Sequence, residues 1–219
     1  MKRINYEKYL QTKFNIVSSI ICNTPKITKM NKNKHTKTYN KWVEDGYKYF
    51  AEVGPTTFSI KELSEISELS RTSFNYYFDN KNLFFNILIE YHLKEIKEFG
   101  KLAVSNKTDV TSGIIKSMEK FHIGMKFHTQ LFNNRKNTQF NNAYLEGHKI
   151  SYCNGILNWF IDYFKLNISK ENGKKVFLLF VDVLNTRFNI SYQHNNSISF
   201  STIFLEVVAD FKLLLKSKI

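Results

Sequence analysis

Cysteine is scarce in this chain, with only Cys22 and Cys153 among 219 residues. The two lie far apart, and neither has partners at the spacing of zinc ligands, so the sequence supports neither a disulfide framework nor a zinc site. This cysteine usage predicts a reducing cytoplasm as the compartment and no bound metal.

Long apolar runs are lacking as well. No stretch approaches the roughly 18 uninterrupted apolar residues of a membrane span. Residues 16–22 (IVSSIIC) are too few and are broken by serines, and no small-residue cleavage site follows them. We therefore predict no membrane partner and no export.

Catalytic motifs are missing too. The eight glycines are dispersed, so there is no phosphate-cradling loop, and neither G-x-S-x-G nor H-E-x-x-H occurs. The sequence predicts that the protein is not an enzyme and carries no cofactor.

Apolar and aromatic side chains are abundant, at 42% and 16% of residues, which is enough to fill a sizeable core. No strand-like alternation is sustained, whereas apolar residues recur at helical spacing. The predicted fold class is therefore all-α. The predicted helices span residues 38–53, 59–67, 71–78, 81–102, 110–132, 139–164, 170–192 and 199–216.

The net charge of +13 is unevenly distributed. Residues 1–41 hold ten Lys/Arg and one acid, a local net of +9, whereas residues 42–100 hold six basic and ten acidic side chains, a local net of −4. A basic total attracts polyanions in general. Residues 42–100 do not form a general basic patch, however, so a DNA phosphate bound there would have to contact a few individual Lys or Arg side chains.

Residues 59–78 predict two short helices joined by a tight turn. Ser59 and Glu62 form the S-x-x-E capping box of the first helix, in which the hydroxyl accepts the Glu62 N–H and the carboxylate reaches back. Ile60, Leu63 and Ile66 then fall on its inner face. The turn follows at residues 68–69.

Ser70 is suited to cap the second helix, which runs to about Phe78. Phe74, Tyr77 and Phe78 give this helix a buried side at i, i+3 and i+4. The opposite side carries donors, acceptors and one ring, from Arg71, Thr72, Ser73, Asn75 and Tyr76. A face of this kind is suited to contact a polar partner.

Residues 39–91 resemble the tetracycline-repressor (TetR) family of transcription regulators. Residues 42–54 (WVEDGYKYFAEVG) resemble its first helix and terminating glycine, and residues 70–83 (SRTSFNYYFDNKNL) resemble its recognition helix and the start of its fourth helix. Two positions depart from the family pattern. Glu68 stands where a turn glycine is usual, so a left-handed backbone there would cost roughly 1 kcal/mol or more. Asn75 replaces a common tyrosine.

The resemblance implies an N-terminal three-helix helix-turn-helix DNA-binding domain, residues 36–92, followed by a helical effector-binding and dimerisation domain, residues 93–219. Residues 1–35 form a basic N-terminal extension. Two interpretations stand for residues 1–29: they belong to the native protein, or they are an over-extended reading frame and Met30 is the start.

DNA contacts are expected from both helices of the motif. Arg71 is the candidate for a bidentate guanine contact and Asn75 for an adenine edge, and Thr72 and Ser73 could meet bases or methyl groups. Phosphates would be held by side chains flanking these positions. The remaining candidate DNA-binding residues are Ser59, Lys61, Ser70, Tyr76, Tyr77 and Lys81.

Aromatic side chains are dense between residues 121 and 164, which suggests a mostly apolar pocket for a small apolar or aromatic effector. The candidate lining residues are Phe121, Met125, Phe127, His128, Tyr144, His148, Tyr152 and Trp159.

The apolar stripe on residues 200–215 is too wide for one protomer's core, so we expect a homodimer. Asp182 and Arg187 lie in the apolar run 176–190, where they are either an interface salt bridge or functional charges. The family's effector-driven mechanism implies that the helix 81–102 tilts and releases a palindromic DNA operator.

The sequence thus predicts a DNA-binding transcription regulator, typically a repressor released by an effector. Two alternatives remain: a helical protein-interaction module that no longer binds DNA, and an effector-independent DNA-binding protein.

Overall fold

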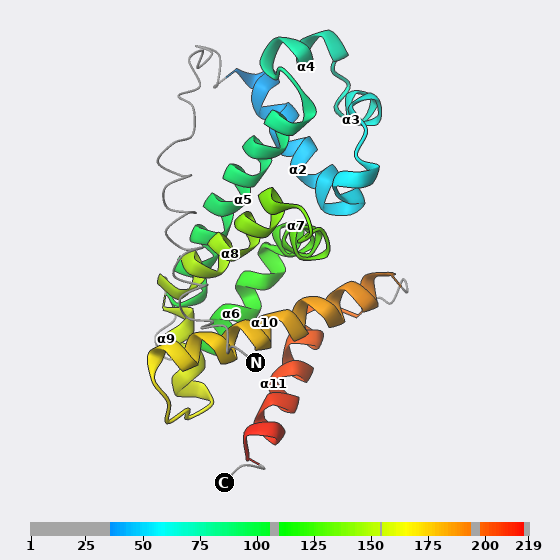
Figure 1. The fold of residues 1–219 in the computed structure, drawn as a ribbon. Coiled ribbons are helices and arrows are strands. Elements are labelled where there is room, and N and C mark those ends of the chain that lie inside the picture. The colour runs from blue at the N-terminus through cyan, green and yellow to red at the C-terminus, as the bar shows by residue number, and fades with distance from the viewer. Residues whose placement is uncertain (1–35, 106–109, 154, 194–197, 217–219) are drawn as a thin grey trace, which may run out of the picture. The chain divides into compact units, whose positions relative to one another are not determined.

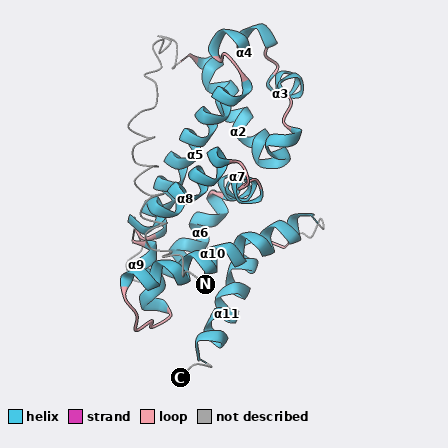
Figure 2. Ribbon diagram, viewed as in Figure 1, coloured by secondary structure: helices cyan, strands magenta, loops and turns pink. Residues whose placement is uncertain are grey.

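The computed structural model describes residues 36–105, 110–153, 155–193 and 198–216. Every regular element in these segments is a helix and none is a strand, as Figure 2 shows. The prediction of an all-α chain is confirmed at this level. The predicted N-terminal extension, residues 1–35, lies outside the described residues.

Ten helices follow one another through these segments (Figure 1). They are α2 (Lys37–Thr57), α3 (Ile60–Ser67), α4 (Arg71–Tyr77), α5 (Lys81–Ala103), α6 (Val110–Lys120), α7 (His122–Asn133), α8 (Thr138–Cys153), α9 (Ile156–Tyr163), α10 (Lys170–Gln193) and α11 (Phe200–Lys216).

Two of the predicted helices are wrong, because each proves to be a pair. The helix expected over 110–132 breaks at Phe121, whose φ of −96° and ψ of 18° lie outside the helical region. The helix expected over 139–164 is interrupted before α9, where Gly155 has a φ of +86°. Glycine takes this left-handed conformation without a Cβ clash. The apolar pattern runs on through both breaks, so periodicity alone predicted continuous helices.

Gly54 ends the regular part of α2, as its place in the sequence suggested. Its φ of 69° and ψ of 176° are non-helical. A Cβ there would lie 2.4 Å from Oε1 of Gln130, a side chain of α7 whose Nε2 donates to the Ala51 carbonyl at 3.3 Å. Any larger residue would therefore disturb both the backbone and the packing of α7 on α2.

One aromatic cluster fills the space between α2, α3, α4 and α5. Trp42, Phe74 and Phe84 are fully buried, and their rings make edge-on contacts at centroid distances of 5.3 and 5.1 Å. Edge-to-face pairs of this kind add to the gain from apolar burial. The same cluster continues into α7 and α8, because Phe127 stacks on Phe50 with ring centroids 4.5 Å apart.

A second cluster joins the C-terminal half of α5 to α6, α9, α10 and α11. It takes in most of the apolar stripe of α11, which is buried inside the protomer: Phe200, Ile203, Phe204, Val207, Val208 and Phe211. Only the C-terminal end of the stripe, at Leu214, is strongly exposed. The expectation that this stripe exceeds one protomer's core is therefore wrong for most of its length.

Candidate functional site

The α3–turn–α4 unit begins with a side-chain cap. Ser59 has an extended backbone, and its Oγ accepts the Glu62 N–H at 3.4 Å. The Glu62 carboxylate accepts a hydrogen bond from the Tyr49 hydroxyl on α2. The predicted cap of α3 is thus present, but the Glu62 carboxylate contacts α2 rather than completing the reciprocal half of the capping box.

The turn between α3 and α4 has a left-handed residue at Glu68, with a φ of 53° and a ψ of 35°. The Leu69 N–H donates to the Ser64 carbonyl at 3.1 Å, and the Ser64 hydroxyl donates to the Leu69 carbonyl at 2.6 Å. These two bonds close the turn. The conformation expected at the position usually held by glycine is therefore adopted by a glutamate, at a steric cost.

Helix α3 is rotated slightly from the predicted orientation. Leu63 and Ser67 are fully buried, one turn apart, whereas Ile66 is 55% exposed. Ile66 therefore does not share the burial of Leu63, although the apolar spacing predicted both on one face.

Helix α4 is capped by Ser70, whose Oγ accepts the Ser73 N–H at 3.2 Å. Phe74 anchors it in the core, and the Trp42 indole donates to the Ser73 hydroxyl at 3.1 Å. The outward face is polar with one ring, Tyr76, which is 59% exposed. The α4 residues exposed to solvent are Arg71, Thr72, Asn75 and Tyr76.

The other candidate DNA-binding residues differ in accessibility. Lys61 is exposed on α3, and Tyr77 is half-buried. Lys81 is half-buried, and its Nζ donates to the carbonyls of Phe58 at 2.9 Å and of Pro55 at 3.4 Å. These bonds leave at most one of its three donors for a phosphate. Lys81 thus ties α5 to the C-terminal end of α2 and to Phe58 just after it, a role that the sequence pattern did not suggest.

A chain of buried polar rings runs from α2 to α7. The Tyr47 hydroxyl and His92 Nδ1 are hydrogen-bonded at 2.8 Å, and His92 Nε2 and His128 Nδ1 at 3.2 Å. His92 is fully buried. Neither Tyr47 nor His92 was among the predicted site residues, yet His92 lies four residues from both Leu88 and Ile96. The 3.6-residue period of α5 therefore already places it on the inner face.

Burial keeps these histidines neutral. Desolvation lowers the pKa of His128 to about 4. Desolvation and the nearby His128 together hold the pKa of His92 well below its usual value. The pKa of His148 is likewise well below its usual value, because of burial first and the neighbouring His128 and Arg135 second. At neutral pH all three side chains are uncharged imidazoles.

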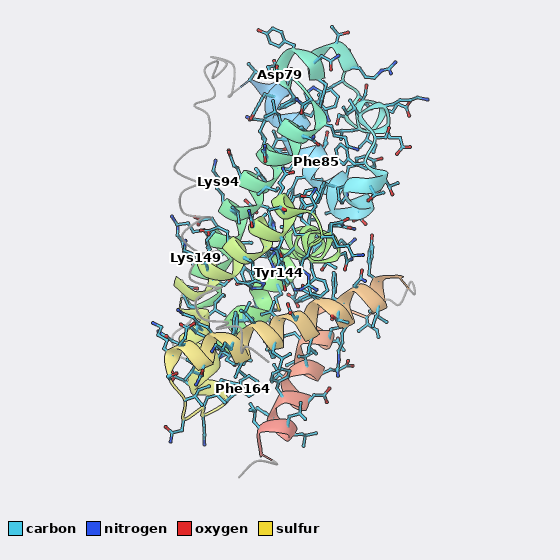
Figure 3. All side chains as sticks on the ribbon, in the orientation of Figure 1. Asp79, Phe85, Lys94, Tyr144, Lys149 and Phe164 are labelled. Carbon is cyan, nitrogen blue, oxygen red and sulfur yellow. The ribbon has the colours of Figure 1, made fainter. Side chains whose placement is uncertain are left out.

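Tyr144, which is labelled in Figure 3, connects α8 to α10. Its hydroxyl donates to Asp182 Oδ1 at 2.5 Å and accepts from Asn185 Nδ2 at 3.4 Å. Arg135 lies 3.8 Å from the same aspartate. Arg187, the other charge of this apolar run, pairs with Asp210 of α11 at 2.5 Å. Both charges are therefore used in ion pairs within the chain.

A cavity of about 80 Å³ lies between α5, α6, α7, α8, α9, α10 and α11. Five predicted pocket residues line it: Phe121, Met125, His128, His148 and Trp159. Tyr144 is buried beside this wall, stacked on His128, and Phe127 belongs to the first aromatic cluster instead. The Tyr152 side chain lies outside the described residues.

The cavity wall is mostly apolar. His128, His148 and Ser151 are polar residues that line it, and the indole of Trp159, another lining residue, donates to the Thr111 hydroxyl at 3.4 Å. The Ser151 hydroxyl donates to the Gly147 carbonyl at 3.1 Å. His148 Nε2 is buried and has no hydrogen-bond partner in the part of the chain that the structure describes. A buried polar atom of this kind is uncommon and needs an explanation.

No group of three or more His, Cys, Asp or Glu in the described segments is arranged to hold a metal ion. No helix among the same residues is long and apolar enough to cross a membrane. Comparison of the chain with family models, with curated proteins and with solved structures gives no match.

Proposed function

We propose that this protein is a DNA-binding transcription regulator of the TetR type. One observation carries the proposal: α4 is anchored by Phe74 in the core and presents Arg71, Thr72, Asn75 and Tyr76 to solvent. The four outward side chains offer hydrogen-bond donors and acceptors within two helical turns. In helix-turn-helix proteins, the second helix, which follows the first after a tight turn, lies in the major groove of DNA.

The candidate DNA-binding side chains have different roles in this proposal. Arg71, in the first turn of α4, contacts a guanine edge through its two-pronged guanidinium, and Asn75 pairs with an adenine edge. Lys61 and Tyr76 contact phosphates and fix the register. Ser59, Ser70 and Ser73 act indirectly, because their hydroxyls cap or brace the two helices.

A homodimer completes the proposal, because a palindromic operator presents two half-sites about one DNA turn, roughly 34–36 Å, apart. With the α11 stripe largely buried, the interface must use other side chains. Leu179 and Ile190 are exposed on α10, and Leu205 and Leu213 are exposed on α11 at i and i+8. Exposed leucines on the last two helices are suited to a two-fold contact.

The proposed effector site is the cavity in the second aromatic cluster. It lies against α5, which also packs on the motif through Phe84 and Leu88. If α5 can take two placements and the ligand binds the protein better in one of them, ligand binding would change the fraction of dimers that can bind DNA. Such a protein would act as a repressor released by its effector.

A protein-interaction module is the second candidate, and the charge distribution favours it. Residues 42–100 carry a net charge of −4, whereas DNA-binding surfaces are usually strongly positive. In that case Tyr76 and Ile66, both more than half exposed, would contact a protein partner. Exposed aromatic residues are enriched in protein interfaces.

A gel-shift of the full chain on DNA from its own gene's upstream region separates the two candidates. We expect a salt-sensitive complex that Arg71→Ala weakens on that DNA more than on a random duplex. Lys149, exposed on α8 and labelled in Figure 3, provides the matched control, because Lys149→Ala also removes one surface cation. The absence of any sequence-selective complex would leave the interaction module as the better proposal.

A further inference from the structure

His128 belongs to two features at once. Its ring lines the cavity, and its Nδ1 is hydrogen-bonded to His92, which in turn is hydrogen-bonded to Tyr47 of α2. Beyond Tyr47, α2 also carries Trp42, whose indole holds Ser73 of α4. A continuous series of hydrogen bonds and one rigid helix therefore join the cavity wall to the base of the α4 face.

The few polar residues that line the cavity define the chemistry of a ligand. His148 lines the cavity, and its buried Nε2 has no hydrogen-bond partner among the described residues, so a ligand group that reached it would satisfy an otherwise unpaired buried atom. Among the described residues no Asp, Glu, Lys or Arg lines the cavity, so an ionised ligand would be buried there without a counter-charge from them. The fitting ligand is thus neutral, with an apolar body and one hydrogen-bonding group.

Cavity size limits that body to a single ring. The volume of about 80 Å³ is well below the roughly 150 Å³ of an apolar cavity that accepts benzene, and below the range of drug-sized sites. Met118 and Met125 line the cavity. Because methionine has three rotatable side-chain bonds and adapts its shape, movement of these two residues can supply the missing space.

We propose that the cavity binds a neutral one-ring alcohol or phenol with its hydroxyl on His148 Nε2 and its ring against His128, and that the Tyr47–His92–His128 chain transmits this binding to α2 and α4. This inference rests on the proposed function, an effector-responsive regulator. It adds the chemical class of the effector and the residues through which effector binding reaches α4. The contacts that carry it cross three helices, since Tyr47, His92 and His128 lie on α2, α5 and α7.

The two tryptophans make this testable without DNA. Trp159 lines the cavity, and Trp42 braces α4. In the ¹⁵N-labelled full chain, phenol should shift the indole signal of Trp159 in a saturable way, and the indole signal of Trp42 should follow the same titration curve. Benzene is the matched probe without a hydroxyl. His148→Leu should weaken phenol roughly tenfold while leaving benzene within about twofold, the change expected for one lost hydrogen bond.

Tyr47→Phe tests the coupling, because it removes only the hydroxyl and keeps the ring that stacks on Phe127 at 4.6 Å. Phenol should still saturate the Trp159 signal with an affinity within about twofold of wild type, and the Trp42 response should disappear. His92→Asn, which breaks the same chain, repeats the test if Tyr47→Phe does not fold by circular dichroism.

Three results would overturn the proposal. They are no saturable Trp159 shift with phenol, equal loss of phenol and benzene in His148→Leu, and a Trp42 response that survives both breaks in the chain. A failed gel-shift with intact indole responses would instead reject DNA binding and leave the site and its coupling standing. Specific DNA binding without indole responses would reject this inference alone.

Discussion

Acidification should destabilise the protein through its buried histidines before its carboxylates titrate. The pKa of His128 falls from an ordinary value of about 6.5 to about 4 in the folded chain. Between these values the unfolded chain binds a proton that the folded chain does not, so the free energy of unfolding decreases as the pH falls. Above pH 6.5 both states are neutral and the full stability is retained.

The two pKa values set the size of this effect. A difference of about 2.5 units corresponds to about 3.4 kcal/mol in all, of which about 2 kcal/mol is lost between pH 7 and pH 5. His92 and His148 add to the loss, because burial lowers the pKa of each. Acid exposure should therefore remove a sizeable part of the 5–15 kcal/mol typical of folded domains.

Urea unfolding followed by circular dichroism at pH 7, 6 and 5 measures this loss. His128→Gln removes the titrating group and should reduce the loss by about 2 kcal/mol. His122→Gln, at an exposed position on the same helix, serves as the control for loss of a histidine that is not buried. A wild-type stability that does not change between pH 7 and 5, or an unchanged slope in His128→Gln, would refute the burial described for this histidine.

Three further outcomes are expected. Glu68→Gly should raise the free energy of unfolding by about 1 kcal/mol, seen as a higher urea midpoint at unchanged slope, because glycine takes the left-handed turn without strain. Arg71→Ala should cost about 1–3 kcal/mol on the cognate DNA and little on random DNA, and equal losses would make Arg71 a phosphate contact. Leu213→Glu, at a side chain that is 69% exposed, should give a folded monomer in sedimentation, whereas Val208→Glu, at 3% exposure, should unfold the protomer at a cost of several kcal/mol.

Local signals predicted the motif well. Ser59 and Ser70 are caps because a short hydroxyl before an apolar repeat satisfies free N–H groups at a helix start, whatever surrounds it. The burial of Phe74 follows from helical spacing in the same way, whereas the left-handed backbone at Glu68 was expected only from the resemblance, as the position of a usual turn glycine. Such features depend on a few neighbouring residues, so the sequence alone contains them.

Features that depend on distant residues were harder to predict. The exposure of Ile66 and the burial of Ser67 depend on how α3 packs on its neighbours, which no local pattern specifies. The break at Phe121 lies in an unbroken apolar pattern, and there the ring stacks on Phe99 of α5 with centroids 5.2 Å apart. The partnership of His92 with Tyr47 spans 45 residues. Neither side chain was predicted as a site residue, and helical spacing alone cannot pair residues that lie on different helices.

The sharing of one aromatic cluster by α2, α5, α7 and α8 bears on how the chain can be divided. Phe127 of α7 stacks on Phe50 and on Tyr47, and Phe140 of α8 contacts Phe85, so the hydrophobic core of the first four described helices is closed by later ones. A fragment ending near residue 92 would leave those rings bare to water. The segment that carries the motif therefore could not be transplanted or shuffled as an autonomous module, and its melting is tied to that of the helices that enclose the cavity.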